Sequence, residues 1–175
     1  DAELKRLAET GTGVAHCPIS NMKLSSGIAR IPEMLKLGVR VGLAVDGSAS
    51  NDGSDLLEEL RTGFLLHRLN SSSAGYDMLK IATRGSASIL GRDDIGQIAE
   101  GMAADFFLIN MDRLSLTGAQ FDVSSMLGTV GYKGNVDYTV VNGRVVVCEG
   151  RLTGVDEEKI TAEAKQCVSR YLDRS

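Results

Sequence analysis

Asp46 is the residue of this chain whose type and position point most directly to chemistry. It ends the apolar run 41–45 and is followed by the small and polar residues of "GSASND". A carboxylate is seldom placed at the end of a buried strand without a cation or hydrogen-bond donors nearby. His16 stands in the same relation to the short apolar segment "GVA". Because ligands collect at the carboxyl ends of parallel strands, Asp46 and His16 are the first candidates for a site.

Each candidate also has a purely structural interpretation. Asp-Gly is a common turn dipeptide, so Asp46 would serve equally well as a turn residue after a strand. A lone histidine beside a cysteine and a proline, as His16 is, is more often packed and hydrogen-bonded. His67 falls near the apolar stripe of a predicted helix and away from the strand ends, so we expect a structural or surface position for it. The residues alone leave these alternatives open.

The first half of the chain alternates strands with helices. The opening residues have helical spacing that Gly11 or Gly13 would end, and they read as the middle of a helix in a longer protein. "GVAHCP" and "VRVGLAV" predict strands on either side of the helix "PEMLKLG". Two more helices, "DLLEELRTGFLLHRL" and "YDMLKIATRGSASILG", are joined by the Ser/Gly-rich linker 70–75. This repetition of strand and helix favours a parallel sheet or barrel.

The helix after the second strand carries two signals. Asp55 and Glu58 have capping-box spacing at its start. Its apolar stripe is expected to consist of Leu56, Leu57, Leu60 and Phe64.

The second half of the chain has a different pattern. "IGQIAEGMAADFFLIN" predicts two short strands around a glycine turn. "VDYTVVNGRVVVCEGRL" predicts a hairpin with Asn142-Gly143 as its type I′ turn. A closing helix follows over 156–173, with acids in its first turn and an apolar face at Ile160, Ala164, Val168, Tyr171 and Leu172.

Composition narrows the class of protein. The net charge is −4, 43% of the residues are hydrophobic and 24% are charged, without a basic run that would suggest nucleic acid. The apolar stretches are too short to span a bilayer, and no signal-peptide pattern is present. Cys17, Cys148 and Cys167 lack C-x-x-C spacing and are expected to be reduced thiols. We therefore expect a cytoplasmic protein without nucleic-acid or membrane partners.

The wording of the whole chain resembles a known family. The segment from "AHCPISN" through "VGLAVDGSASND" to "LLHRL" is similar to the last two βα units of the amidohydrolase superfamily. It is nearest to the branch of cytosine, guanine and 8-oxoguanine deaminases and triazine hydrolases, and its second part is nearest to the 8-oxoguanine deaminases. "ATRGSASILG" with "IGQIAEGMAADFFLIN" resembles this family's passage from barrel to accessory sheet, and "VVNGRVVVCEGRL" resembles its final hairpin.

The resemblance implies an α/β fold. The chain would form the carboxyl-terminal part of a (β/α)8 TIM barrel, namely its last two βα units, plus part of an accessory β-sandwich. Residues 1–90 would hold the barrel units and following helices, and 91–152 a portion of the sandwich. Residues 153–175 would be a carboxyl-terminal helix packing back on the barrel.

The resemblance also implies a metal site. One divalent metal, zinc or alternatively iron, would be held mostly by ligands on strands that this chain does not contain. Asp46 alone maps onto a ligand position, at the end of the eighth strand, where it would be both metal ligand and catalytic residue. A carboxylate that touches metal and water can accept the proton of that water. His16, Ser50 and Asn51 would be candidates for substrate binding, and Gly47 departs from the asparagine of atrazine chlorohydrolase.

The implied function of the parent protein is hydrolysis of a carbon–nitrogen bond in a cyclic amidine. The favoured reaction is hydrolytic deamination of a purine-like heterocycle, with 8-oxoguanine first. Guanine or cytosine deamination and chloro- or aminotriazine hydrolysis are the alternatives within this class. Two alternatives are not hydrolases. The first is a metal-free barrel relative that serves as an assembly module, and the second is a small α/β binding domain. The partners would be a small heterocycle, the remainder of the polypeptide and a second copy of the parent, and the 175-residue chain alone is expected to be inactive.

Overall fold

The computed structural model describes residues 1–72 and 75–173, so two residues of the predicted linker 70–75 lie outside the described residues. The chain forms two compact units. The first comprises residues 1–103 and 110–134, and the second comprises residues 104–109 and 135–175. The predicted three-part division at residues 90 and 152 stays a prediction about the parent protein.

The first unit is an α/β structure. Its elements, in chain order, are α1 (Ala2–Thr10), β1 (Gly13–His16), α2 (Pro18–Lys23), α3 (Ile31–Lys36), β2 (Arg40–Leu43), α4 (Leu56–Arg68), α5 (Gly75–Lys80), the π-helical turn η1 (Ile81–Gly85), α6 (Ser86–Ile89), the 3₁₀ turns η2 (Leu114–Leu116) and η3 (Ala119–Asp122), and α7 (Val123–Thr129). Helix α1 ends at Gly11, whose φ of 65° is left-handed, as its sequence predicts.

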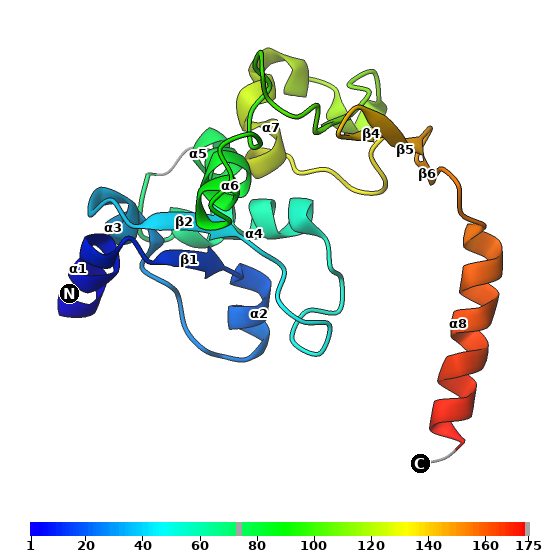
Figure 1. Cartoon of the computed structure of the whole chain (residues 1–175), viewed down its shortest axis with the longest axis horizontal. Coiled ribbons are helices and arrows are strands. Elements are labelled where there is room, and N and C mark those ends of the chain that lie inside the picture. Colours follow the sequence, from blue (N-terminus) through cyan, green and yellow to red (C-terminus); the bar gives the residue numbers. More distant parts are fainter. Residues whose placement is uncertain (73–74, 174–175) are drawn as a thin grey trace. The chain divides into compact units, whose positions relative to one another are not determined.

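Strands β1 and β2 are parallel neighbours, which confirms the predicted strand–helix–strand pattern (Figure 1). His16 pairs with Leu43, and the Ala44 amide donates to the His16 carbonyl at 2.9 Å. The buried residues of β2 include Val41 and Leu43, as expected for a strand covered on both faces. Because the two strands end at the same level, the segments that follow His16 and Leu43 meet at one edge.

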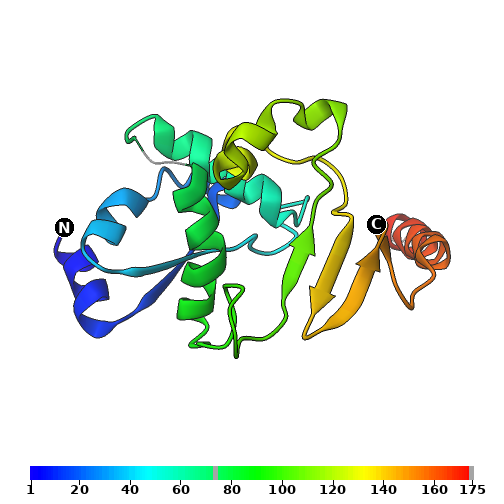
Figure 2. The ribbon, with the colours of Figure 1, turned by 90° about the horizontal axis from the view of Figure 1, so that it is seen from above.

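The continuous helix α5–η1–α6 packs directly on this strand pair (Figure 2). Small residues make the close approach possible. A Cβ on Gly85 would fall on the carbonyl oxygen of Val41, and a Cβ on Gly42 would lie 2.8 Å from the Cα of Ser86. The Ser86 hydroxyl in turn accepts from the Leu43 amide at 3.1 Å. The π-helical turn therefore lies where helix backbone and strand backbone touch.

Helix α4 confirms the predicted cap but corrects the predicted stripe. The Asp55 carboxylate accepts from the amides of Leu57 and Glu58 at 2.9 and 3.2 Å, which satisfies two free donors of the first turn. Leu56, which the stripe included, is 41% exposed. The predicted Leu60 and Phe64 are buried, and the rest of the buried face consists of Glu59, Gly63 and His67.

The second unit is built on an antiparallel sheet in the order β3-β4-β5-β6. Its elements are β3 (Phe106–Leu108), β4 (Tyr138–Val141), β5 (Arg144–Cys148), β6 (Arg151–Leu152) and α8 (Glu157–Leu172). Asn142 and Gly143 have φ values of 46° and 77°, so the predicted type I′ turn is confirmed.

The prediction of two strands within 95–110 is wrong for the first of them. Only β3 forms there, and residues 95–103 make turns and bends. Gly96 and Gly101 have left-handed backbones, and the Ala103 amide donates to the Asp94 carbonyl at 2.8 Å. These turns close the segment on itself, so it has no extended backbone to offer to a neighbouring strand.

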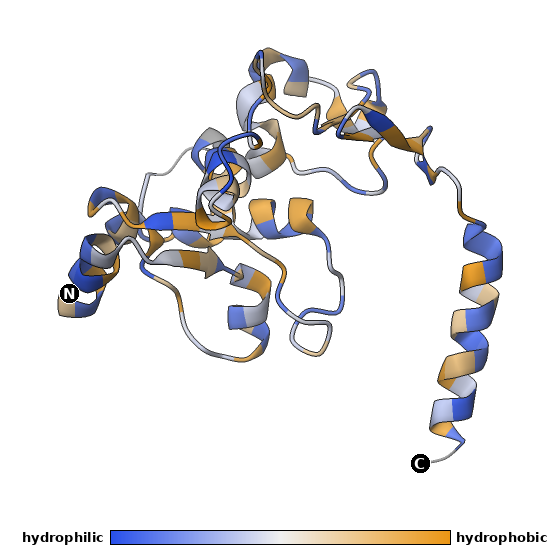
Figure 3. Ribbon diagram, in the orientation of Figure 1, coloured by the Kyte–Doolittle hydropathy of each residue, from blue (hydrophilic) through white to orange (hydrophobic). Residues whose placement is uncertain are grey.

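Helix α8 forms where it was predicted, and the Asp156 carboxylate caps it by accepting from the Lys159 amide at 2.8 Å. None of its residues is buried, and hydrophobic and hydrophilic residues alternate along its ribbon (Figure 3). Packing of this helix on a barrel stays a prediction. Within the described part of the chain, no helix has the length and apolar character needed to cross a membrane.

Candidate functional site

Asp46 follows strand β2 and presents an exposed carboxylate at the carboxyl end of the strand pair. Its φ of 66° is left-handed, a conformation that Asp tolerates better than most residues. Oδ2 accepts from the Ser20 hydroxyl at 2.5 Å, and Oδ1 accepts from the Gly47 amide at 2.8 Å. The Ser20 hydrogen bond, followed by that of Gly47, holds the pKa of Asp46 below its ordinary value. Asp46 is therefore an ionised carboxylate with a fixed orientation.

Helix α2 places Ser20 against this carboxylate. The helix begins at Pro18, which suits a first helical turn because it has no amide hydrogen to leave unpaired. The Ser20 side chain is only 2% exposed, so its hydroxyl is confined to its contact with Asp46. One residue earlier, the Ile19 amide donates to Glu59 Oε2 at 3.0 Å. Both contacts join the segment after β1 to the segments after β2.

The loop after Asp46 folds back on itself. The hydroxyl and the amide of Ser50 both donate to the Gly47 carbonyl at 3.0 Å, and the Asn51 amide donates to the same oxygen at 2.9 Å. The Asn51 side chain is 2% exposed, and its Nδ2 donates to Glu59 Oε1 at 2.5 Å. Asn51 Oδ1 accepts from the Gly53 amide at 3.2 Å. Ser50 thus stays at the partly exposed rim, whereas Asn51 is fixed beneath the loop.

Glu59 is the feature of this region that sequence reasoning missed. Its side chain is completely buried on α4, although a charged residue within a helix ordinarily faces solvent. Burial raises the pKa of Glu59, while the Ile19 amide opposes that rise. A signal was present in the sequence, since Glu59, Gly63 and His67 are spaced by four residues and share one helical face.

His16 and His67 form a buried contact below the strand ends. Their Nε2 atoms lie 3.0 Å apart, and the rings are tilted by 45° with centroids 5.0 Å apart. Burial, aided by the neighbouring His67, lowers the pKa of His16 to about 4, and burial also lowers the pKa of His67. Two neutral rings in opposite tautomers make this hydrogen bond. The Nδ1 atom of His16 has no hydrogen-bond partner.

His67 therefore occupies the structural position that its sequence context predicts. His16, a candidate for substrate binding, is only 2% exposed and turns its ring toward His67.

The donor chemistry of Asp46 fits one ligand of a divalent metal. Ser20 and Gly47 donate to different carboxylate oxygens and the Ser50 side chain also interacts with the group, which faces solvent and keeps a lone pair for a ligand. Carboxylate oxygens are common ligands of zinc. Among the residues that the structure describes, no group of three or more His, Cys, Asp or Glu side chains is placed to hold a metal ion. Asp46 can thus contribute to a metal site that other segments would complete.

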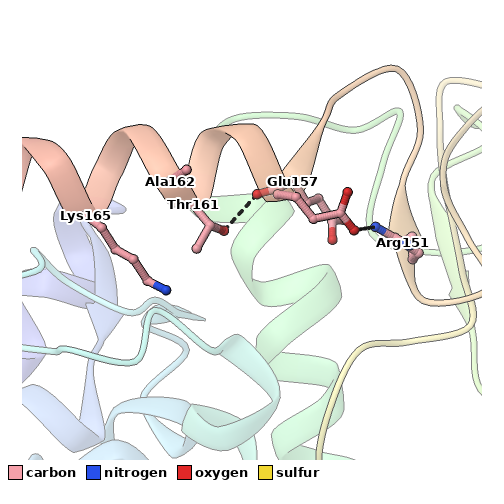
Figure 4. A pocket seen from close by; sticks show the side chains of 6 residues that line it. Arg151, Glu157, Thr161, Ala162 and Lys165 are labelled. Atoms are coloured by element: carbon pink, nitrogen blue, oxygen red, sulfur yellow. Dashed lines mark hydrogen bonds and ion pairs between the residues drawn. The ribbon is translucent and has the colours of Figure 1, made fainter.

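A hollow between β6 and α8 lacks comparable chemistry (Figure 4). The residues that line it are Arg151, Glu157, Glu158, Thr161, Ala162 and Lys165. Arg151 Nη2 lies 2.7 Å from Glu158 Oε1, and both side chains are largely exposed. Exposed ion pairs of this kind are ordinary surface features and contribute little to stability. The ends of β1 and β2 therefore hold the better candidate site.

The parallel strand pair, its covering helices and the oriented carboxylate after the second strand define an α/β protein whose candidate site lies at the carboxyl ends of its strands. Residues 1–146 match the amidohydrolase family. The chain belongs to the amidohydrolase family, which confirms the resemblance found in its sequence.

Curated relatives cover almost the whole chain. It is 45% identical to hydroxydechloroatrazine ethylaminohydrolase of Pseudomonas sp. (strain ADP), over 98% of this chain and 37% of that protein. It is 39% identical to 5-methylthioadenosine/S-adenosylhomocysteine deaminase of Pelotomaculum thermopropionicum, over 99% of this chain and 41% of that protein. It is also 39% identical to 8-oxoguanine deaminase of Pseudomonas aeruginosa, over 97% of this chain and 38% of that protein.

Solved structures give the same result. Atrazine chlorohydrolase from Arthrobacter aurescens TC1, complexed with zinc, matches with a TM-score of 0.88 and 35% identity, over 94% of this chain and 38% of that one. An adenosine deaminase from Xanthomonas campestris with bound zinc matches with a TM-score of 0.87 and 30% identity, over 97% of this chain and 39% of that one. The chain thus spans about two fifths of the length of the relatives it matches.

Proposed function

We propose that this chain is the carboxyl-terminal part of a metal-dependent amidohydrolase that hydrolyses carbon–nitrogen bonds of amino-substituted nitrogen heterocycles. The observation that carries the proposal is Asp46. It is an exposed, ionised carboxylate that Ser20 and Gly47 orient at the carboxyl end of β2. The proposal is also supported by the family of this chain, because two of its relatives are named as deaminases.

In the parent protein, β1 and β2 would be the last two strands of a (β/α)8 barrel. Within the described residues each of them has one strand neighbour, so each can pair with a further strand on its other side. Strands β3–β6 would belong to the accessory sandwich, and α8 would pack on the barrel. The remainder of the polypeptide is therefore the first partner of this chain, and a second copy of the parent would be another.

The metal would be zinc, supported by the two zinc-bound structures that the chain resembles and by the free lone pairs of Asp46. When bound, such an ion makes a coordinated water more acidic. Asp46 would accept the proton of the attacking water on its carboxylate and pass it to the leaving nitrogen. Ser20 and Gly47 hold the carboxylate in one orientation throughout, because each donates to a different oxygen.

Among the residues after Asp46, Ser50 is the candidate for contact with the substrate, because its side chain is partly exposed at the rim of the loop. His16 and Asn51 are buried and bonded to His67 and Glu59, so their contribution to substrate binding would be indirect.

8-Oxoguanine is the first substrate candidate, supported by the wording of "VGLAVDGSASND" and by the relative from Pseudomonas aeruginosa. An ethylamino-substituted hydroxytriazine is the second, because the relative at 45% identity is named for that hydrolysis. Both are planar nitrogen heterocycles with an amino substituent on a ring carbon, so the same attack and proton transfer would serve either.

The test uses the full-length, zinc-loaded protein with 8-oxoguanine, guanine, cytosine, 5′-methylthioadenosine and ethylaminotriazines. Ammonia and ethylamine are measured together with the metal content. Ammonia release that is fastest from 8-oxoguanine would support the first candidate, and ethylamine release that is fastest from the triazine would support the second. If neither product forms while zinc is bound, the enzymatic proposal fails, and a protein that retains no zinc would instead support the metal-free assembly role.

A further inference from the structure

We infer that Glu59 and Asn51 form a positioning pair that fixes the two segments on which Asp46 depends, namely helix α2 and the loop 47–53. The pair lies below the strand ends, and neither side chain is more than 2% exposed. Neither residue is assigned a role in the reaction by the resemblance in the sequence beyond the substrate contact considered for Asn51. The catalytic part of this inference rests on the proposed function of Asp46.

The carboxylate of Glu59 uses both of its oxygens to join distant segments. Oε1 accepts from Asn51 Nδ2 at 2.5 Å, and Oε2 accepts from the Ile19 amide at 3.0 Å. These partners lie 8 and 40 residues away in the chain. A single side chain on α4 therefore ties the segment after β1 to the segment after β2.

Helix α2 needs this contact because it has no cap of its own. Its N-cap residue, Cys17, makes no side-chain hydrogen bond to the first turn. The free amides of a first turn require acceptors, and Glu59 supplies one from another helix to Ile19. Ser20 is the next residue, and its hydroxyl donates to Asp46. The position of α2, and with it the donor to Asp46, is thus set by Glu59.

Asn51 fixes the loop in the same way. Its side chain donates to Glu59 and accepts from the Gly53 amide, while its own amide donates to the Gly47 carbonyl. Asp46 precedes this loop with a left-handed backbone, a conformation that persists when its surroundings determine it. The loop closed by Asn51 provides such surroundings.

The direction of each hydrogen bond makes the pair testable. In Glu59→Gln one oxygen becomes an NH₂ group, so a donor faces either Asn51 Nδ2 or the Ile19 amide. In Asn51→Asp a second carboxylate faces Glu59 at close range. The double variant Glu59→Gln/Asn51→Asp exchanges the amide and the acid. The new amide at position 59 can then donate to the new carboxylate at position 51 and accept from Ile19. That carboxylate can still accept from Gly53, so all three contacts are restored.

The experiment compares the full-length zinc-loaded wild type, both single variants and the exchanged double variant. Glu58→Gln serves as the matched control, because Glu58 is the exposed neighbour of Glu59 on α4. Hydrogen exchange of the Ile19 and Gly53 amides reports the contacts, and kcat and KM on the best heterocycle report the reaction. We expect both single variants to lose amide protection and to lower kcat roughly 10- to 100-fold, because small displacements of reacting groups are costly. KM should change less, and the exchanged variant should recover protection and much of kcat.

The two readouts separate the possible failures. Protected amides and unchanged kcat in Glu59→Gln would overturn the inference. Lost protection with unchanged kcat would overturn the positioning role, and failure of the exchanged variant to recover protection would overturn the proposed hydrogen-bond directions. If the wild type turns over none of the heterocycles, the proposed function fails, and hydrogen exchange alone then decides whether the pair holds α2 and the loop.

Discussion

The two compact units of this chain place their polar groups in opposite ways. In the first unit, five polar or charged side chains of the described residues are buried around the ends of β1 and β2, and they are His16, Ser20, Asn51, Glu59 and His67. In the second unit, no residue of the described stretches 104–109 and 135–173 is buried at all. The difference shows that side-chain orientation is fixed by buried contacts in the first unit and not in the second. Buried polar groups are costly unless they are paired, so a cluster of them marks a place where geometry is specified.

The second unit is specified by local rules instead. Strands β4, β5 and β6 follow one another through short turns, such as that at Asn142 and Gly143, and Asp156 caps α8, so that the β3–β4 ladder is the long-range pairing of this sheet. Apolar side chains such as Val145 and Val168 are at least 50% exposed, so they offer surface that other segments could cover. We therefore expect substitutions in the first unit to act over long distances and those in the second to act locally.

The largest effect is expected from Asp46→Asn in the full-length zinc-loaded protein. Asparagine tolerates the left-handed backbone but cannot accept a proton, so kcat should fall roughly 100- to 10,000-fold with little change in stability. Steady-state kinetics and urea unfolding measure the two quantities. Asp52→Asn is the matched control, because Asp52 lies in the same loop with its side chain 83% exposed and bonded to Lys23. Equal activity of the Asp46→Asn variant and the wild type would remove Asp46 from the mechanism.

The next effect concerns two glycines, one in each unit. Gly85→Ala would place a methyl group on the Val41 carbonyl, so the helix and β2 must separate, and we expect the free energy of unfolding to fall by about 3 kcal/mol. Gly154→Ala meets nothing within 4 Å and strains only a left-handed φ of 78°, at a cost of about 1 kcal/mol. Urea unfolding of the full-length protein compares them. A cost at Gly154 as large as that at Gly85 would show that the second unit is packed as tightly as the first.

Acid should weaken the first unit through its histidine pair. The ordinary pKa of histidine is 6.5, and that of His16 in the folded chain is about 4. Between these values the unfolded chain binds a proton that the folded chain excludes. The contribution of neutral His16 to the free energy of unfolding should therefore be complete above pH 6.5. The free energy of unfolding should fall by about 3 kcal/mol as the pH drops to 4. Urea unfolding at several pH values should show a flatter dependence in His16→Gln, and an unchanged slope would contradict the prediction.

The smallest effects on stability are expected from removing the N-caps of helices α4 and α8, one in each unit. Asp55→Ala removes the cap of α4, which is packed into the first unit, so the free energy of global unfolding should fall by about 1 kcal/mol. Asp156→Ala removes the cap of α8, which has no buried residue within this chain, so any loss of global stability above roughly 0.5 kcal/mol would have to come from the proposed packing of α8 on the barrel. Hydrogen exchange in the first turn of α8 should nevertheless accelerate. A global loss from Asp156→Ala would mean that α8 is docked in the full-length protein.

The features that followed from the sequence depend on neighbours in the chain. The parallel strands, the turn at Asn142 and Gly143, and the cap at Asp55 each obey a rule that covers a few residues. The placement of Asp46 at a strand end is of the same kind, because the apolar run before it and the small residues after it define that end.

The features that the sequence did not reveal depend on distant residues. The His16–His67 contact spans 51 residues, and Glu59 meets Ile19 across 40, so no local rule reports them. Hydrophobicity also misled the assignment of the α4 face, because Leu56 is exposed while the charged Glu59 is buried. An acid can occupy a buried face when its oxygens find donors, and those donors become visible only when the fold brings them together.

The left-handed backbone at Asp46 has a consequence for how this gene can change. Besides glycine, asparagine and aspartate are the residues that accept such a backbone most readily. Both asparagine and glycine codons lie one nucleotide away from those of aspartate, and neither residue carries an acid. Most other replacements would strain the turn, and selection would remove them as folding defects. Asparagine and glycine at this position would still allow the chain to fold. If the proposed role of Asp46 holds, a folded descendant without catalysis is therefore a single mutational step from the proposed enzyme.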